Sequence, residues 1–131
     1  MNVFAKLLGA GVLMLAASGA GAQDAYPTRP VRIMIGFPPG GVTDVIARIM
    51  APELQKEFGQ PFVVENRPGA AGIIGAEQVA KSPADGHTLL FIPSTHTVHP
   101  ALRKEMPYDT VGDFTAITLL VTAPNLFIVR A

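Results

Sequence analysis

A change of hydrophobic periodicity across the stretch FPPGG constrains the fold of this chain more than any other feature. Residues 31–37, VRIMIGF, are nearly continuous in apolar and β-favouring side chains, as expected of a parallel strand covered on both faces. Residues 44–58 instead place apolar side chains four apart, at Ile46, Met50 and Leu54. The sequence therefore predicts a buried strand, a tight loop and a helix in immediate succession.

Two residues set the expected course of this helix. Gly59 directly follows the last apolar position of the pattern and is predicted to be the C-cap. Pro52 lies inside the pattern and has no N–H to donate to the carbonyl of Arg48, so we expect a kink or a break there.

The same alternation continues along the rest of the chain. A second strand is predicted at residues 61–66, and the glycine-rich turn after it, RPGAAGIIG, leads into a helix that reaches Ala80. Further strands are predicted at residues 87–94, 116–122 and 125–130, with a short helical turn near THTVHPALRKE. Alternating strands and helices of this kind predict an α/β fold with a parallel sheet and helices on both faces.

Residues 1–22 have the pattern of a secretory signal peptide. Lys6 is the only charged residue before Asp24, an apolar run follows it, and an A-x-A cleavage pattern ends at Ala22. The run is shorter than the roughly 20 residues that span a bilayer, which argues against a transmembrane anchor. We therefore expect export, cleavage after Ala22 and a mature part of residues 23–131.

Charge and cysteine content narrow the classes of partner. The chain has 10 Lys and Arg residues against 10 Asp and Glu residues, and removal of residues 1–22 takes away Lys6 and leaves a net charge near −1. Such a balance gives no long-range attraction for nucleic acid or anionic lipid, so neither a nucleic acid nor direct membrane insertion after cleavage is expected. There is no cysteine, so the core rather than disulfides must stabilise the mature part.

Three predicted strand ends would meet at one rim of the sheet, where open α/β sheets bind their ligands. They are residues 37–41, 67–75 and 94–96. Glycines let a ligand approach the main chain closely, and a helix N-terminus offers unpaired N–H groups with a partial positive charge. The pattern therefore indicates a site for a small anion that is held by main-chain amides.

Other readings of these residues stay open. The glycines could serve only tight strand-to-helix turns, with Thr43 as N-cap and Asp44 favourable in the first helical turn. His96 and His99 stand three apart but lack a third candidate ligand nearby, so no metal is predicted. Ser94 near His96 has no G-x-S-x-G elbow, and the glycines match neither a dinucleotide fingerprint nor a P-loop, so neither catalysis nor a cofactor is predicted.

A family resemblance supports the anion-binding interpretation. The stretches YPTRPVRIMIGFPPGGVTDVIAR, GQPFVVENRPGAAGIIGAEQVAKSPADGHTLL and PYDTVGDFTAITLL resemble the substrate-binding receptors of tripartite tricarboxylate transporters, often called Bug receptors, and the likeness runs from Tyr26 to the last residue. It implies the parallel-sheet lobe of a two-lobed periplasmic binding protein of type II, which captures a small carboxylate for a membrane permease and holds it largely through main-chain groups. The positions that match the family's ligand loops are Pro38, Pro39, Gly40, Gly41, Ala70, Gly72, Gly75, Ser94, Thr95 and His96.

The chain also departs from the family pattern. Ile73 stands where the second loop usually has Asn, and His99 stands where Asn often precedes Pro, and both changes bear on ligand selectivity. The second lobe of the family would follow about where this chain ends, so residues 23–131 are interpreted as an incomplete first lobe with the second lobe absent. With one wall of the cleft missing, the polypeptide alone is expected to bind carboxylates poorly. The alternatives are an exported α/β enzyme that binds an anionic substrate at its helix N-termini, or a truncated remnant without function.

Overall fold

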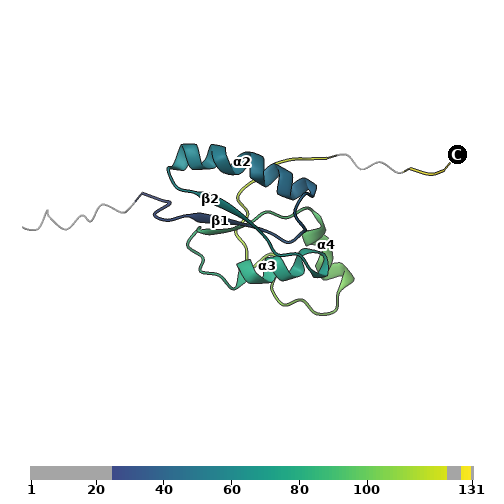
Figure 1. The fold of residues 1–131 in the computed structure, drawn as a ribbon. Helices are drawn as coiled ribbons and strands as arrows, with labels where there is room; N and C mark the ends of the chain where they lie inside the picture. Colours follow the sequence, from purple (N-terminus) through teal and green to yellow (C-terminus); the bar gives the residue numbers. More distant parts are fainter. Residues whose placement is uncertain (1–24, 124–127, 131) are drawn as a thin grey trace, which may run out of the picture.

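The computed structural model describes residues 25–123 and 128–130, so the predicted signal peptide lies outside the described residues. Three strands and three helices, with one 3₁₀ turn, form the structured part (Figure 1). In chain order they are β1 (Val31–Ile35), α2 (Val42–Phe58), β2 (Phe62–Asn66), the 3₁₀ turn η2 (Ala70–Gly72), α3 (Ile73–Ala80), β3 (Thr88–Leu90) and α4 (Thr95–Leu102). No helix among these is both long and apolar enough to cross a bilayer.

The strands form one parallel sheet in the order β2-β1-β3. Val31 of β1 lies opposite Phe62 of β2, and Arg32 lies opposite Thr88 of β3. The β3 ladder continues past the strand, because the N–H of Phe91 donates to the carbonyl of Met34 at 2.9 Å. The prediction of an α/β fold with a parallel sheet is confirmed.

Helix α2 covers one face of the sheet and α3 covers the other, as Figure 1 shows. Alternate residues of β1, Val31, Ile33 and Ile35, are buried in one cluster with Ala47 and Ala51 of α2. This is why β1 is apolar along nearly its whole length: its side chains alternate between two covered faces. The predicted placement of helices on both faces is confirmed.

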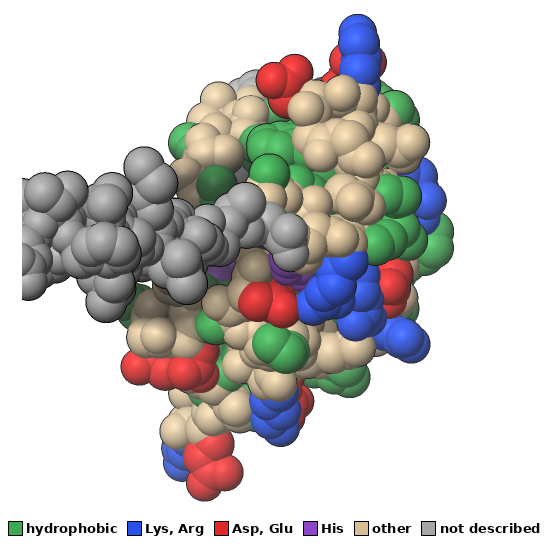
Figure 2. Space-filling model, turned by 90° about the vertical axis from the view of Figure 1, so that its left-hand side faces the viewer, with side chains coloured by type: hydrophobic (Ala, Val, Ile, Leu, Met, Phe, Trp, Pro, Cys, Tyr) green, Lys and Arg blue, Asp and Glu red, His purple; other side chains and the backbone are tan. Residues whose placement is uncertain are grey.

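A second apolar cluster lies under α3. Ile73 and Ala76 are buried there with Tyr108, and Phe114 packs against them. The segment after α4 is therefore attached to the α3 side of the sheet through aromatic side chains. On the face shown in Figure 2, acidic and basic side chains are interspersed, in keeping with a formal net charge of 0.

Helix α2 begins earlier than predicted and is not interrupted. Its N-cap is Gly41, and the predicted C-cap Gly59 is confirmed, with a φ of 71° and an N–H that donates to the carbonyl of Gln55 at 2.9 Å. The helix continues through Pro52, so the expected break is absent. Ala47 and Ala51 before Pro52, and Leu54 after it, pack on the sheet side and hold the helix across the missing hydrogen bond.

The predicted strands at residues 116–122 and 125–130 are wrong where the structure describes them. Residues 116–123 and 128–130 form no strand, and Ile117, Leu119 and Val129 are 76%, 78% and 73% exposed. An apolar pattern makes a strand only where a neighbour completes its backbone hydrogen bonds, and the described residues pair none with these segments. The predicted strand at residues 87–94 is shorter, at Thr88–Leu90, because the chain turns toward α4.

Candidate functional site

A hollow lies where the chain reverses direction across the sheet. The connection from β1 leads to β2 on one side, and the later connection returns across β1 to β3 on the other. This is the position at which open α/β sheets bind ligands, outside the carboxyl ends of the strands. The hollow has a volume of about 500 Å³, and its lining residues are Phe37, Ala71, Thr95, Val98, His99, Leu102 and Arg103.

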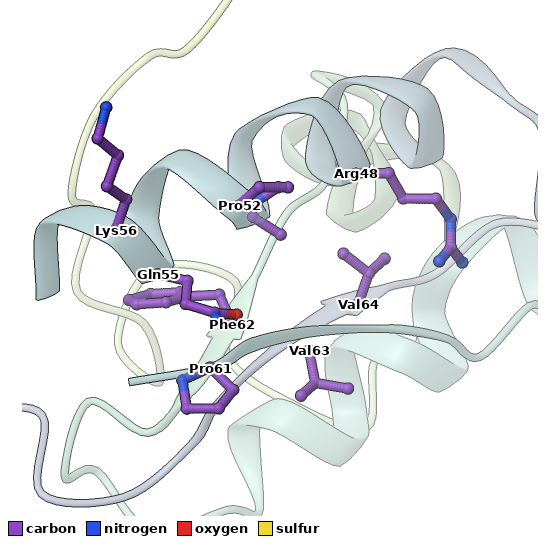
Figure 3. Close-up of a pocket in the computed structure, with 9 residues that line it drawn as sticks. Arg48, Pro52, Gln55, Lys56, Pro61, Phe62, Val63 and Val64 are labelled. Atoms are coloured by element: carbon purple, nitrogen blue, oxygen red, sulfur yellow. The ribbon is translucent and has the colours of Figure 1, made fainter. Parts of the chain in front are cut away.

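Another hollow, of about 610 Å³, lies between α2 and β2. Figure 3 shows Arg48, Pro52 and Lys56 of α2 on one side of it and Phe62 and Val64 of β2 on the other. None of the sequence-predicted site residues lines it. The first hollow is therefore the candidate site, because it joins residues that follow β1, β2 and β3.

Three glycines bring the first two loops into contact. A Cβ atom on Gly36 would lie 2.6 Å from the Cα of Gly72, and one on Gly75 would lie 2.8 Å from the Cα of Gly36. A Cβ atom essentially never lies so close to another heavy atom. The start of α3 can therefore pack against the end of β1 only when Gly36 and Gly75 are glycine. Gly72 and Gly75, both predicted ligand positions, are buried, and the structure shows them packing against the backbone.

The second loop winds in the left-handed sense. Residues 69–72 all have positive φ, and two of them are alanines, Ala70 at 48° and Ala71 at 57°. An alanine in this region is strained by about 1 kcal/mol or more, and such strain concentrates at binding sites. The turn places Ala71 on the wall of the hollow.

Some of the predicted loop amides are already paired within the protein. Pro38 and Pro39 have no N–H at all. Three further amides donate to protein groups: Gly40 N–H to Asp44 Oδ2 at 2.9 Å, Gly72 N–H to Gly69 O at 2.9 Å and His96 N–H to Pro93 O at 3.1 Å. The number of amides available to a ligand is therefore smaller than the glycine pattern predicts.

Other amides of the three loops stay available. The N–H groups of Gly41, Ala71 and Thr95 donate to no protein group among the described residues. Ala71 and Thr95 line the hollow, and the first loop reaches it through Phe37, whereas Gly41 is not part of its wall. The structure thus brings the second and third predicted loops together and leaves Pro38 to Gly41 beside them.

Residues of the third loop lie in two different environments, the hollow and the apolar cluster under α3. Thr95 lines the hollow, but His96 belongs to the apolar cluster, where its ring stacks on Tyr108 with centroids 5.6 Å apart and meets the edge of Phe114 at 5.2 Å. Burial lowers the pKa of His96, so the ring is neutral near pH 7. Ser94 carries the turn into α4, and its carbonyl accepts a hydrogen bond from the Thr97 hydroxyl at 2.8 Å.

Sequence reasoning missed most of the wall that α4 provides. Val98, Leu102 and Arg103 line the hollow, in a segment predicted only as a short helical turn. The spacing of Thr95, Val98 and Leu102 is that of one helix face and could have indicated the wall. His99, which was not among the predicted ligand positions, also lines the hollow; it is 6% exposed, and its Nδ1 has no partner among the described residues.

Metal ligation has no support in the geometry of these histidines. No group of three or more His, Cys, Asp or Glu side chains that could hold a metal ion occurs in the described part of the chain.

Asp44, next to the first loop, is a buried carboxylate that accepts several hydrogen bonds. It is 3% exposed, it accepts hydrogen bonds from the Arg48 guanidinium at 3.1 Å and from the Gly40 amide at 2.9 Å, and it lies in the first turn of α2. The hydrogen bonds from Arg48, Gly40 and Asn66 lower the pKa of Asp44 from 3.8 to about 2. The carboxylate is therefore ionised throughout the physiological range.

This pKa predicts an acid-sensitive contribution to stability. Because the folded-state pKa of Asp44 lies below its unfolded-state value, the contribution is complete above about pH 4 and is lost as pH falls toward 2. In Asp44→Asn the midpoint of urea unfolding should therefore fall less steeply between pH 4 and 2 than in the wild-type chain, since other carboxylates of lowered pKa are common to both. Equal slopes in the two proteins would contradict this role of Asp44.

Comparison with known proteins gives the same picture as the geometry. Residues 46–131 match the family model described as the tripartite tricarboxylate transporter family receptor. Protein BugT of Bordetella pertussis is 40% identical over 128 residues, which cover 94% of this chain and 39% of BugT. The chain thus spans about 40% of the length of the curated relatives it matches.

Two solved structures share the fold. The periplasmic binding protein BugD superposes with a TM-score of 0.65 at 38% identity, over 68% of this chain and 30% of BugD. MatC of Rhodopseudomonas palustris, whose structure contains bound malate, gives a TM-score of 0.62 at 38% identity, over 69% of this chain and 31% of MatC. The predicted likeness to periplasmic binding proteins is confirmed, and this chain belongs to the tripartite tricarboxylate transporter receptor family.

Proposed function

We propose that this chain supplies the carboxylate-holding loops of a periplasmic solute-binding protein that serves a tripartite tricarboxylate-type transporter. The observation that carries the proposal is the hollow at the strand-order reversal, where the amides of Ala71 and Thr95 have no acceptor in the described part of the chain. Unpaired amides near the start of a helix favour a negatively charged group. A small carboxylate is the anion that fits the family, and MatC holds malate.

The mode of binding follows from the lining of the hollow. Main-chain amides would hold one carboxylate, while Phe37, Val98 and Leu102 would contact the carbon chain of the ligand. The chain would act by capture and delivery rather than by chemical conversion. Its partners would be the ligand and the membrane permease subunits of the transporter, and the predicted signal peptide, residues 1–22, would direct it to the periplasm and be removed there.

The predicted domain organisation sets the expected affinity. Residues 23–131 are proposed to form the first lobe of a two-lobed protein, and a flytrap gains affinity by enclosing the ligand between both lobes. Three or four missing hydrogen bonds, at about 1 kcal/mol each, weaken binding by roughly two to three decades. We therefore expect roughly millimolar affinity for the 131-residue chain alone.

Titration of the ¹⁵N-labelled chain with malate tests the proposal, because chemical shifts report weak binding at each amide. The shifts of Gly41, Ala71 and Thr95 should move with one common, roughly millimolar dissociation constant, and succinamide, which lacks the charge, should leave them unchanged. No movement at tens of millimolar malate, or movement confined to the groove between α2 and β2, would exclude the proposed function. Micromolar affinity would contradict the expectation of weak binding by one lobe.

A proline at residue 41 tests whether an amide of the first loop takes part. Gly41 has a φ of −74° and an N–H without an acceptor among the described residues, so Gly41→Pro is compatible with that φ and removes the donor. We expect about a tenfold loss of malate affinity, since a hydrogen bond to a charged group is worth about 1.5–3 kcal/mol. Gly41→Ala keeps the N–H, its Cβ would lie 3.6 Å from the Pro38 carbonyl, and it should bind like the wild type. Equal affinity of the two variants would remove Gly41 from the site.

A further inference from the structure

We propose that Asp44 is a positioning residue that fixes the first loop in its ligand-binding conformation and withdraws the Gly40 amide from the ligand. This inference rests on the proposed function for its ligand part. Its other part, the fixing of the loop, can be observed without any ligand.

The first step is that Asp44 forms a hydrogen bond to the first loop at Gly40. The N–H of Gly40 donates to Oδ2 of Asp44 at 2.9 Å, across the start of α2. Gly40 has a φ of +82°, so this hydrogen bond holds the loop in a left-handed conformation that a free chain would adopt only part of the time. The carboxylate therefore stabilises one loop conformation among several.

The second step is that Asn66 connects the same carboxylate to β1 and β2. Its Nδ2 donates both to Oδ1 of Asp44 at 2.9 Å and to the carbonyl of Phe37 at 3.1 Å. Asn66 is the last residue of β2, and Phe37 lines the hollow. Both ends of the loop, Phe37 and Gly40, are thus bonded to one Asp44–Asn66 pair.

The third step concerns charge. Arg48 donates to Asp44 at 3.1 Å and to Oδ1 of Asn66 at 3.0 Å. The three side chains are therefore mutually hydrogen-bonded, with Arg48 as the cation. Among the described residues it is the charged group that faces Asp44. Without Arg48, an uncompensated carboxylate would stand near the amides that are proposed to bind an anion.

The consequence for binding is that one amide of the loop is withdrawn. Because Asp44 uses the Gly40 N–H, that amide is not available to a ligand, whereas the N–H of Gly41 has no acceptor among the described residues. A loop that is held in place before the ligand arrives also spares the entropy of ordering it, which raises affinity without a direct contact. Asp44 thus acts on the ligand through the loop and not by touching it.

The test compares Asp44→Ala with Thr43→Ala. Thr43 lies in the same helical turn, and its side chain makes no hydrogen bond among the described residues, so it controls for a change of helix start. In Asp44→Ala the Gly40 amide should exchange with solvent about tenfold faster and malate affinity should fall about tenfold, while the amides of β1 and β3 keep their wild-type shifts. Thr43→Ala should match the wild type in both measurements.

A conservative variant separates positioning from a general loss of structure. Asp44→Asn can still accept from Gly40 and from Nε of Arg48 through the oxygen at the Oδ2 position, but its amide nitrogen cannot accept from Asn66, and its charge is lost. It should therefore fall between the wild type and Asp44→Ala in exchange and in affinity. Should Asp44→Ala fail to fold, Asp44→Asn carries the same comparison against Thr43→Ala.

Each outcome decides a stated part of the inference. Unchanged exchange of Gly40 in Asp44→Ala would overturn the fixing of the loop. Faster exchange with unchanged malate affinity would overturn the effect on the ligand. If the wild-type chain itself shows no malate response, the proposed function fails and the ligand part fails with it, whereas the exchange comparison still decides whether Asp44 fixes the loop.

Discussion

Replacement of Gly36 by alanine should destabilise the protein by about 3 kcal/mol and abolish the malate response. The new Cβ would lie 2.6 Å from the Cα and 2.7 Å from the carbonyl O of Gly72, and neither backbone atom can rotate away as a flexible side chain would. The start of α3 must then move off the end of β1, and forced overpacking of this kind costs about 1–3 kcal/mol or more. Urea unfolding followed by circular dichroism measures the effect, with the malate titration as the second readout.

Gly41→Ala is the matched control for this clash. Its Cβ meets only ordinary van der Waals contact, so its unfolding midpoint should be nearly that of the wild type. If Gly36→Ala were as stable as Gly41→Ala, the close approach of the first two loops would not exist in solution.

Ile35→Ala should cost about 3–4 kcal/mol through a cavity in the core. Ile35 is fully buried at 0% exposure and packs in the cluster between β1 and α2. Truncation of a buried isoleucine loses its burial and leaves a cavity that the surrounding structure fills only in part, at a cost of about 2–5 kcal/mol. The difference between the free energies of unfolding in urea measures it.

An exposed isoleucine provides the comparison. Ile49 lies on α2 with 68% of its surface exposed, and Ile49→Ala should change the free energy of unfolding by no more than about 0.5 kcal/mol. Similar losses for Ile35→Ala and Ile49→Ala would mean that the β1–α2 interface is not a packed core.

The ordered half of the fold could be predicted because its local signals and its tertiary contacts agree. The apolar run that became β1 is buried on both faces, and Gly59 ends α2 with the left-handed conformation that its type favours. Agreement of this kind between levels makes a sequence specify one structure. The start of α2 at Val42 was missed by two residues, because helix ends depend on the cap geometry rather than on the apolar pattern.

The strands predicted at residues 116–122 and 125–130 show the limit of a local pattern. Alternating apolar residues indicate that a segment can join a sheet, but a hydrogen-bonded neighbour decides whether it does. In the described parts of these segments the neighbour is missing and the apolar side chains are exposed. The sequence alone does not contain that information.

The arrangement of the three loops could be predicted, but their hydrogen bonding could not. The strand ends were correctly expected at one rim, since parallel strands share the direction of their carboxyl ends. In the first loop the Gly40 amide is paired with Asp44, whose side chain accepts from it across the start of α2. An acidic residue four positions after Gly40, in the first turn of a helix, resembles a capping box and could have indicated this bond.

The positive φ angles of residues 69–72 mean that a D-amino acid would fit this turn better than an L-amino acid. An L-alanine at residue 70 or 71 holds a backbone conformation that its mirror image prefers, since the steric conflict of the Cβ with the following carbonyl reverses with configuration. A D-alanine at either residue would therefore relax the turn without changing its composition or its charge. At residues 70 and 71 the backbone thus has the conformation that a chain of D-residues would favour.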